Sequence, residues 1–403
     1  MTIFPLNRKR DNESKSRVKT CAIFIASILL LGALIPTTLT LFPGQLLNQV
    51  LADTVTGTDG DDKLDGTDGD DDIEGKGGDD KIDSKGGDDE NTGDKNEGDG
   101  DGGNDNIDSG DGDDINTGDN SNGDGNGGDD VINSGDGNDF NSGDNEIGNG
   151  DGGDDVINSG DGFFDTNIGD NAVGDGNGGD DVINSGKGND RNFGDNQNGV
   201  GNGGNDVINS GAGDDDNTGD NFFGVGNGGD DVINSGDGND FNKGDNINGV
   251  GNGGNDVINS GDGFDFNVGD NNNGVGNGGN DVINSGAGDD TNVGDNRFSS
   301  GDGGNDVIDS GDGNDFNVGD NFEGNGDGGD DVINSGKGND FYFGDNLIGS
   351  GAGGDDKINA AQGDDQLTGG GGADKFKCGS GVDTVTDFNE AEGDKASGNC
   401  EIP

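Results

Sequence analysis

Gly125-Asn-Gly-Gly-Asp-Asp-Val-Ile-Asn133 begins a unit that recurs along most of this chain. The unit continues as Ser134-Gly-Asp-Gly-Asn-Asp-Phe-Asn-Ser142 and ends with Gly143-Asp-Asn-Glu-Ile-Gly-Asn149. One position marks the register: Ile107, Ile132, Ile157, Ile183, Ile208, Ile233, Ile258, Ile283, Ile308, Ile333 and Ile358. Each step is twenty-five residues, except for one step of twenty-six. A fixed period of this length predicts a solenoid in which each repeat is one coil and neighbouring coils share a core.

The composition excludes a conventional globular core. The chain has 403 residues, 94 of them glycine, no histidine or tryptophan, only 24% hydrophobic residues and a formal charge of -67. Such acidity excludes nucleic acid as a natural partner and favours cations. The alternative is a disordered acidic polymer, which we expect for the metal-free chain. For the metal-loaded chain we expect order, because a random low-complexity sequence would not keep an isoleucine in register over eleven units.

The first 52 residues differ from the rest. Six basic residues precede an apolar run over 22–35, and Val50-Leu51-Ala52 offers small residues where a signal peptidase cleaves. We interpret residues 1–52 as a secretory signal. An uncleaved membrane anchor is the alternative, since apolar residues continue to Phe42. The remaining sequence has no second apolar segment, so we expect it to lie outside the membrane, secreted or at the cell surface.

The repeat period divides the rest of the chain. Residues 53–92 are nonapeptides, such as Gly57-Thr-Asp-Gly-Asp-Asp-Lys-Leu-Asp65. Residues 93–350 hold units of two nonapeptides plus a seven-residue insert, Gly-Asp-Asn-x-x-Gly-x. Residues 351–403 return to nonapeptides and form a C-terminal cap. There Cys378 and Cys400 are the two cysteines beyond the signal, and we expect one disulfide between them.

The residue types predict an all-β parallel roll or helix. Alternation in Asp130-Val-Ile-Asn133 points Ile132 inward, where it stacks on Ile107 at about 4.8 Å. The second nonapeptide places asparagine at the equivalent inward position: Asn116, Asn141, Asn167, Asn192, Asn217, Asn242, Asn267, Asn292 and Asn317. Identical amides can hydrogen-bond along a stack.

The insert predicts a third corner in each coil. Its asparagines suggest a second inward column, including Asn120, Asn145, Asn221, Asn246 and Asn321, or simply turn residues. The unit at 159–167 carries one extra residue, for which we expect a bulge and a damaged metal loop.

The loops have the chemistry of a calcium site. Glycines let backbone carbonyls turn toward a common centre, and an aspartate adds a carboxylate; calcium takes six to eight such oxygens. Two carboxylates about 4.8 Å apart repel by roughly 3–4 kcal/mol at an effective dielectric near 20. A buried isoleucine contributes only about 1.5–3 kcal/mol. The sequence therefore predicts folding coupled to Ca²⁺ binding.

The nonapeptides resemble those of RTX (repeats-in-toxin, haemolysin-type) calcium-binding proteins, whose pattern is Gly-Gly-x-Gly-x-Asp-x-(Leu/Ile)-x. The resemblance covers residues 57–377 and implies a parallel β-roll with calcium between successive loops. It implies that the sixth-position aspartates are metal ligands. In the first nonapeptides these are Asp62, Asp71, Asp80, Asp105, Asp130, Asp155, Asp181, Asp206, Asp231, Asp256, Asp281, Asp306, Asp331 and Asp356. In the second they are Asp114, Asp139, Asp190, Asp215, Asp240, Asp265, Asp290, Asp315, Asp340, Asp365 and Asp374.

The chain departs from the family pattern in three ways. Position two is usually Asn or Asp, as at Asn126 and Asp327. The second nonapeptide has asparagine where the family has leucine or isoleucine, and the insert interrupts the two-sided roll. The preceding acidic residues, such as Asp129 and Asp154, are interpreted as solvated charge.

Three functions fit this pattern. The leading hypothesis is a secreted calcium-binding solenoid with a structural or adhesive role and no catalytic site. A tail or remnant of a secreted RTX hydrolase or toxin is the second, although the chain lacks histidine and a non-repeat domain. An ice- or mineral-binding surface is the third, although the position after the second aspartate varies (Phe140, Arg191, Thr291).

Overall fold

The computed structural model describes residues 52–403, apart from 97–99, 122–124, 249, 273–275, 298–300, 321–322, 325, 346 and 350. The expected signal segment lies outside the described residues, except for Ala52. In the part of the chain that is described, no helix is long and apolar enough to cross a membrane.

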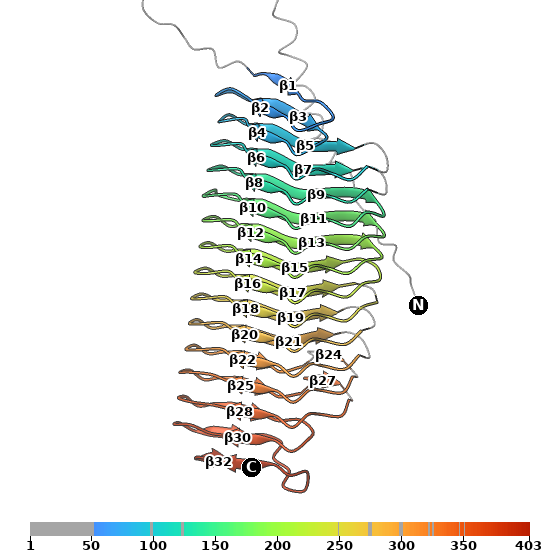
Figure 1. The fold of residues 1–403 in the computed structure, drawn as a ribbon. Helices are drawn as coiled ribbons and strands as arrows, with labels where there is room; N and C mark the ends of the chain where they lie inside the picture. Colours follow the sequence, from blue (N-terminus) through green and yellow to red (C-terminus); the bar gives the residue numbers. More distant parts are fainter. Residues whose placement is uncertain are drawn as a thin grey trace, which may run out of the picture. The chain divides into compact units, whose positions relative to one another are not determined.

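Two parallel sheets run the length of the described solenoid, one on each side of every coil (Figure 1). The isoleucine sheet has 15 strands: β2 (Lys63–Asp65), β4 (Lys81–Asp83), β6 (Asn106–Asp108), β8 (Val131–Asn133), β10 (Val156–Asn158), β12 (Val182–Asn184), β14 (Val207–Asn209), β16 (Val232–Asn234), β18 (Val257–Asn259), β20 (Val282–Asn284), β22 (Val307–Asp309), β25 (Val332–Asn334), β28 (Lys357–Asn359), β30 (Lys375–Lys377) and β32 (Lys395–Ser397). The asparagine sheet has 16 strands: β1 (Thr54–Thr56), β3 (Asp72–Lys76), β5 (Glu90–Asn96), β7 (Ile115–Ser121), β9 (Phe140–Gly148), β11 (Thr166–Gly174), β13 (Arg191–Gly199), β15 (Asp216–Phe222), β17 (Phe241–Ile247), β19 (Phe266–Asn272), β21 (Thr291–Arg297), β23 (Phe316–Val318), β26 (Phe341–Phe343), β29 (Gln366–Thr368), β31 (Asp383–Val385) and β33 (Cys400–Glu401). The predicted all-β parallel solenoid is confirmed.

The isoleucine column lies in the core as predicted. Ile208, Ile233 and Ile258 are direct register partners, and each has no exposed surface. Leu64 and Phe376 continue the same apolar column at its two ends. Because every strand here has only three residues, this one side chain supplies nearly all the apolar burial of its strand.

The predicted asparagine column is also confirmed. Asn217 is fully buried, and its Nδ2 donates to Oδ1 of Asn242 at 2.9 Å. The same amide also donates to the Ser210 hydroxyl at 3.0 Å, and that hydroxyl donates to the carbonyl of Ser235 at 3.3 Å. These serines were not singled out in the sequence. Within the column, the amide and hydroxyl groups thus find partners in their own or the next coil, which removes the penalty of burying them. The exception among the described residues is the Oδ1 of Asn91, at the first coil of the column.

The insert first continues the asparagine-sheet strand and then forms short parallel pairings outside the two main sheets. In the middle coils the asparagine-sheet strand runs on into the insert, so that β9 spans both Asn141 and Asp144. A separate pair of strands forms between β24 (Glu323–Gly324) and β27 (Ile348–Gly349). At the ends of other inserts, isolated parallel bridges join Val200 to Val225 and Val225 to Val250.

Neither of the two interpretations of the insert asparagines holds in full: Asn120 and Asn145 stack in register within strands, but the column is not fully buried. Asn120, Asn145 and Asn221 are half-buried, whereas the aspartates before them, Asp119, Asp144 and Asp220, are fully buried. The side chains of Asn246 and Asn321 lie outside the described set. Strict alternation from the buried Asn141 would bring Asn145 inward. The strand pairing skips Gly143, and beyond this glycine Asp144 lies inward instead.

The extra residue near 163 is accommodated at the surface. Phe163 and Phe164 are exposed, and both of their N–H groups donate to Oδ1 of Asn138, at 3.1 and 3.2 Å. Asp165 remains fully buried and accepts the N–H of Asp139 at 2.9 Å. The bulge is present, but the carboxylate column passes through this coil in register.

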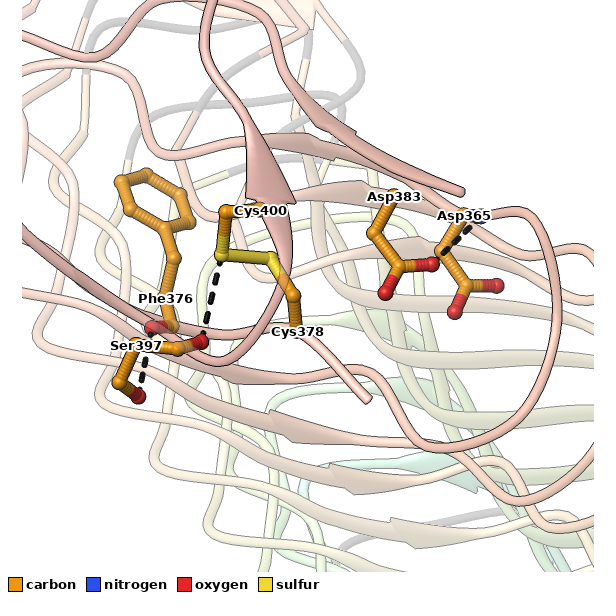
Figure 2. Close-up of a disulfide and its surroundings, with 6 residues drawn as sticks. All are labelled: Asp365, Phe376, Cys378, Asp383, Ser397 and Cys400. Carbon is orange, nitrogen blue, oxygen red and sulfur yellow. Dashed lines mark hydrogen bonds between the residues drawn. A yellow bond between two sulfur atoms is a disulfide. The ribbon is translucent and has the colours of Figure 1, made fainter. Parts of the chain in front are cut away.

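The expected disulfide closes the C-terminal end (Figure 2). It joins Cys378, directly after β30 of the isoleucine sheet, to Cys400 in β33 of the asparagine sheet. Phe376 lies beside it, and the Ser397 hydroxyl donates to the carbonyl of Phe376 at 3.3 Å. The bridge therefore links the two sheets where no further coil follows within the described residues.

We predict that Ile233→Ala lowers the stability of the calcium-loaded protein by about 2–5 kcal/mol, because it leaves a cavity between two identical neighbours. Val232→Ala is the matched control, since Val232 lies on the same strand and is only half-buried. Urea unfolding at fixed free calcium measures both variants. Equal shifts of the urea midpoint would contradict the prediction.

Candidate metal centre

Buried carboxylates follow one another along the isoleucine sheet. Each belongs to the residue just before a strand, and we call these residues the loop aspartates: Asp80, Asp105, Asp130, Asp155, Asp181, Asp206, Asp231, Asp256, Asp281, Asp306, Asp331 and Asp356. Asp206 shows the pattern. Its Oδ1 accepts the N–H of Asp181 in the preceding coil at 2.8 Å. Its Oδ2 is buried with no hydrogen-bond partner among the described residues.

A second set of buried carboxylates comes from the insert, and sequence reasoning missed it. These insert aspartates are Asp94, Asp119, Asp144, Asp170, Asp195, Asp220, Asp245, Asp270, Asp295, Asp320 and Asp345. Asp195 is fully buried, and its Oδ2 accepts the N–H of Gly204 at 2.7 Å. A signal was present in the sequence: Gly-Asp recurs in every insert, while the residues two places after the aspartate vary freely (Glu146, Gln197).

Loop and insert aspartates meet in clusters of three. Most of the clusters named below join the insert aspartates of two successive coils with one loop aspartate. The clusters include Asp80 with Asp94 and Asp105; Asp119 with Asp130 and Asp144; Asp144 with Asp155 and Asp170; Asp170 with Asp181 and Asp195; and Asp195 with Asp206 and Asp220. In the first cluster two loop aspartates flank one insert aspartate. One carboxylate oxygen from each member lies within 4.8 Å of the others, which a single cation at about 2.4 Å from each oxygen can span.

Glycines leave the room that these carboxylates occupy. A Cβ added to Gly194 would lie 1.8 Å from Oδ2 of Asp206, and one added to Gly203 would lie 1.9 Å from Oδ2 of Asp220. Neither contact is possible between real atoms. The glycines of the repeat are therefore required here by close approach as much as by backbone conformation.

The second-nonapeptide aspartates form a separate column along the asparagine sheet. Asp190 donates its N–H to Oδ1 of Asp215 at 2.8 Å, and the pattern repeats along the column. Asp89 and Asp165 also belong to it, although the sequence analysis did not name them. At the C-terminal end the same bond joins Asp365 to Asp383 at 3.2 Å (Figure 2).

Two predicted residues change columns. Asp71 was grouped with the first nonapeptides, but its N–H donates to Asp89, so it lies in the asparagine-sheet column. Asp374 was grouped with the second, but it precedes β30 and accepts the N–H of Asp356, so it lies with the loop aspartates. In the regions that consist of nonapeptides alone, successive nonapeptides contribute strands to the two sheets in turn. Whether an aspartate lies beside the isoleucine sheet or the asparagine sheet therefore depends on how many nonapeptides precede it. The flanking Asp129 and Asp154 are exposed, as expected.

A family model for the RTX calcium-binding nonapeptide repeat matches half of the chain, at residues 52–90, 124–140, 169–200, 225–241, 250–266, 300–320, 324–346 and 350–385. The chain belongs to the RTX calcium-binding repeat family. No curated protein matches it. Several matched segments stop at the second nonapeptide, as at 225–241 and 250–266, and the insert that follows them is outside the match.

Burial makes these RTX carboxylates reluctant to ionise without a counter-charge. Burial, aided by neighbouring carboxylates, raises the pKa of Asp105 and of Asp356 to about 8. Burial and then the charge of Asp231 raise the pKa of Asp206 well above its ordinary value. In the asparagine-sheet column, burial raises the pKa of Asp114 and of Asp240 to about 7, against backbone N–H donors that lower it. A bound cation supplies the missing positive charge and reverses this preference.

We predict that acid partly replaces the metal. Carboxylates whose pKa is raised by folding hold protons that the unfolded chain releases, so their contribution to stability is full at low pH. It is lost as the pH rises through the folded-state values. In a chelator, residues 53–403 should therefore show more β structure at about pH 5 than at about pH 7.5, by far-UV circular dichroism. Calcium-loaded protein should be folded at both. An acid-insensitive spectrum of the metal-free chain would contradict the prediction.

We also predict that Gly194→Ala weakens metal binding, because its Cβ displaces the Asp206 carboxylate. Equilibrium dialysis at a fixed free calcium concentration should find fewer ions bound than in the wild type. Gly60→Ala is the control, since a Cβ there meets no heavy atom within 4 Å. Unchanged binding by Gly194→Ala would show that the carboxylate position is not required.

Proposed function

We propose that this RTX protein binds a column of Ca²⁺ ions along its solenoid and that the ions drive its folding. The observation that carries the proposal is the buried, donor-less carboxylate oxygen of each loop aspartate, such as Oδ2 of Asp206. An isolated buried carboxylate costs several kcal/mol, and here the cost recurs in every coil. A divalent cation converts that cost into attraction, so metal binding and folding become one equilibrium.

Calcium suits these sites better than magnesium. Oxygens spread over as much as 4.8 Å match a shell with bonds of about 2.3–2.6 Å, whereas magnesium requires about 2.0–2.1 Å and keeps several waters. Carboxylate and glycine carbonyl oxygens lie close to one another here, as a seven- or eight-coordinate ion requires. A Cβ added to Gly219 would lie 1.8 Å from Oδ2 of Asp231 and 2.8 Å from the carbonyl oxygen of Gly244.

We further propose that the protein is exported and has a structural or adhesive, non-catalytic role. The basic and apolar character of residues 1–52 supports export, and so does a disulfide, since disulfides persist in oxidising compartments. The absence of histidine from the sequence and the repetition of every acidic pair from coil to coil support ligation over catalysis.

We predict that residues 53–403 gain parallel β structure when calcium is added to the metal-free chain. Circular dichroism and ion stoichiometry should change together, with on the order of ten or more ions bound at about 10⁻⁴–10⁻³ M calcium. Magnesium at the same concentration is the control and should give little change. A chain that is already fully folded in chelator at low ionic strength and neutral pH would overturn the proposal.

A further inference from the structure

Successive clusters share an aspartate. Asp195 belongs both to the cluster with Asp170 and Asp181 and to the cluster with Asp206 and Asp220. Asp144 and Asp170 are shared in the same way. By contrast, Asp155, Asp181 and Asp206, the loop aspartates of these coils, each belong to one of the named clusters. These insert aspartates are therefore members of two neighbouring clusters at once.

Fully buried oxygens without a donor point into these clusters. Asp195, Asp206 and Asp220 expose 0%, 1% and 0% of their surface. Within the described part of the chain, Oδ1 of Asp195, Oδ2 of Asp206 and Oδ1 of Asp220 have no hydrogen-bond partner. The other oxygen of Asp195 and that of Asp206 each accept a backbone N–H, which holds the side chain while one oxygen stays available.

The end of the array is built differently. At Asp345, the last insert aspartate, both oxygens accept backbone N–H groups, Oδ1 from Gly354 at 2.8 Å and Oδ2 from Gly371 at 2.6 Å. After it, Asp387 accepts the N–H groups of Gly369 and Gly370. Where the inserts stop, backbone N–H groups take the place that a cation would fill in the interior coils.

We propose that the insert converts one side of the solenoid into a continuous file of divalent cations, one per coil, in which each insert aspartate bridges two ions. This proposal rests on the calcium-binding function proposed above and assigns the insert its role. Each coil contributes one loop aspartate and one insert aspartate, and hence two negative charges. One Ca²⁺ per coil neutralises them, so that the file is uncharged over its length although the protein surface is strongly acidic.

Sharing makes neighbouring sites interdependent. Loss of a loop carboxylate weakens the one site around it, whereas loss of an insert carboxylate weakens the sites on both sides. Binding of one ion also orders the shared carboxylate for the next, so the file should fill cooperatively.

The experiment counts ions on the full chain by native mass spectrometry in calcium, with far-UV circular dichroism on the same samples. The variants are Asp195→Asn and Asp206→Asn. Both keep an amide oxygen for the N–H that the carboxylate now accepts, and both place an NH₂ group where the ion would bind. Asp237→Asn, at an exposed aspartate, is the matched control.

We expect Asp206→Asn to lose one ion, Asp195→Asn to lose two, and Asp237→Asn to lose none. The double variant Asp195→Asn, Asp206→Asn should lose no more than Asp195→Asn alone, because the two changes disable a common site. The comparison of the double variant with Asp195→Asn remains valid even if a substitution loosens its own coil, because it tests whether the numbers of lost ions add.

The opposite results are distinguishable. If the wild type binds calcium but Asp195→Asn loses no more ions than Asp206→Asn, or the losses simply add in the double variant, the shared file is wrong and the calcium-binding function stands. If the wild type takes up no calcium, the proposed function itself fails.

Discussion

Like charges stacked at the spacing of a β-ladder are the constraint on which this solenoid depends. Repetition places each loop or insert aspartate above the equivalent aspartate of the next coil, as Asp195 and Asp220 show, so the burial of one carboxylate is repeated along the stack. Buried isoleucine, at about 1.5–3 kcal/mol per coil, cannot offset repeated burial of charge. The proposed calcium ions would supply a positive partner in register with these carboxylates.

The same repetition that stacks charges also satisfies the neutral polar groups. Asparagine and serine each carry a donor and an acceptor, so identical residues in neighbouring coils complete one another, as Asn217 and Asn242 do. Aspartate carries only acceptors when ionised and cannot complete itself. This difference in hydrogen-bonding capacity explains why the asparagine column needs nothing from outside and the aspartate columns do.

The ends of the stack require separate solutions, because a terminal coil has a neighbour on one side only. The asparagine column gives way to Ile73 at one end and to Tyr342, Leu367 and Val385 at the other. Apolar or aromatic side chains therefore close the column, and the Oδ1 of Asn91, which faces Ile73, is left without a hydrogen-bond partner among the described residues. The Cys378–Cys400 disulfide then ties the two sheets together at the C-terminal end (Figure 2). Terminal repeats of solenoids are commonly atypical for this reason.

The sequence by itself determined the solenoid, the inward isoleucine and asparagine columns, the disulfide and the loop aspartates, because a strict period converts local alternation into a stacking rule. It did not determine the role of the insert. Asn120 and Asp119 are adjacent and both polar, and only the path of the continuing strand decides that the aspartate turns inward. The sequence also did not assign Asp71 and Asp374 to the correct aspartate column, because the sheet beside which each lies depends on how many nonapeptides precede it. The meeting of insert and loop carboxylates within 4.8 Å joins residues of different segments and different coils, and it therefore exists only in the tertiary structure.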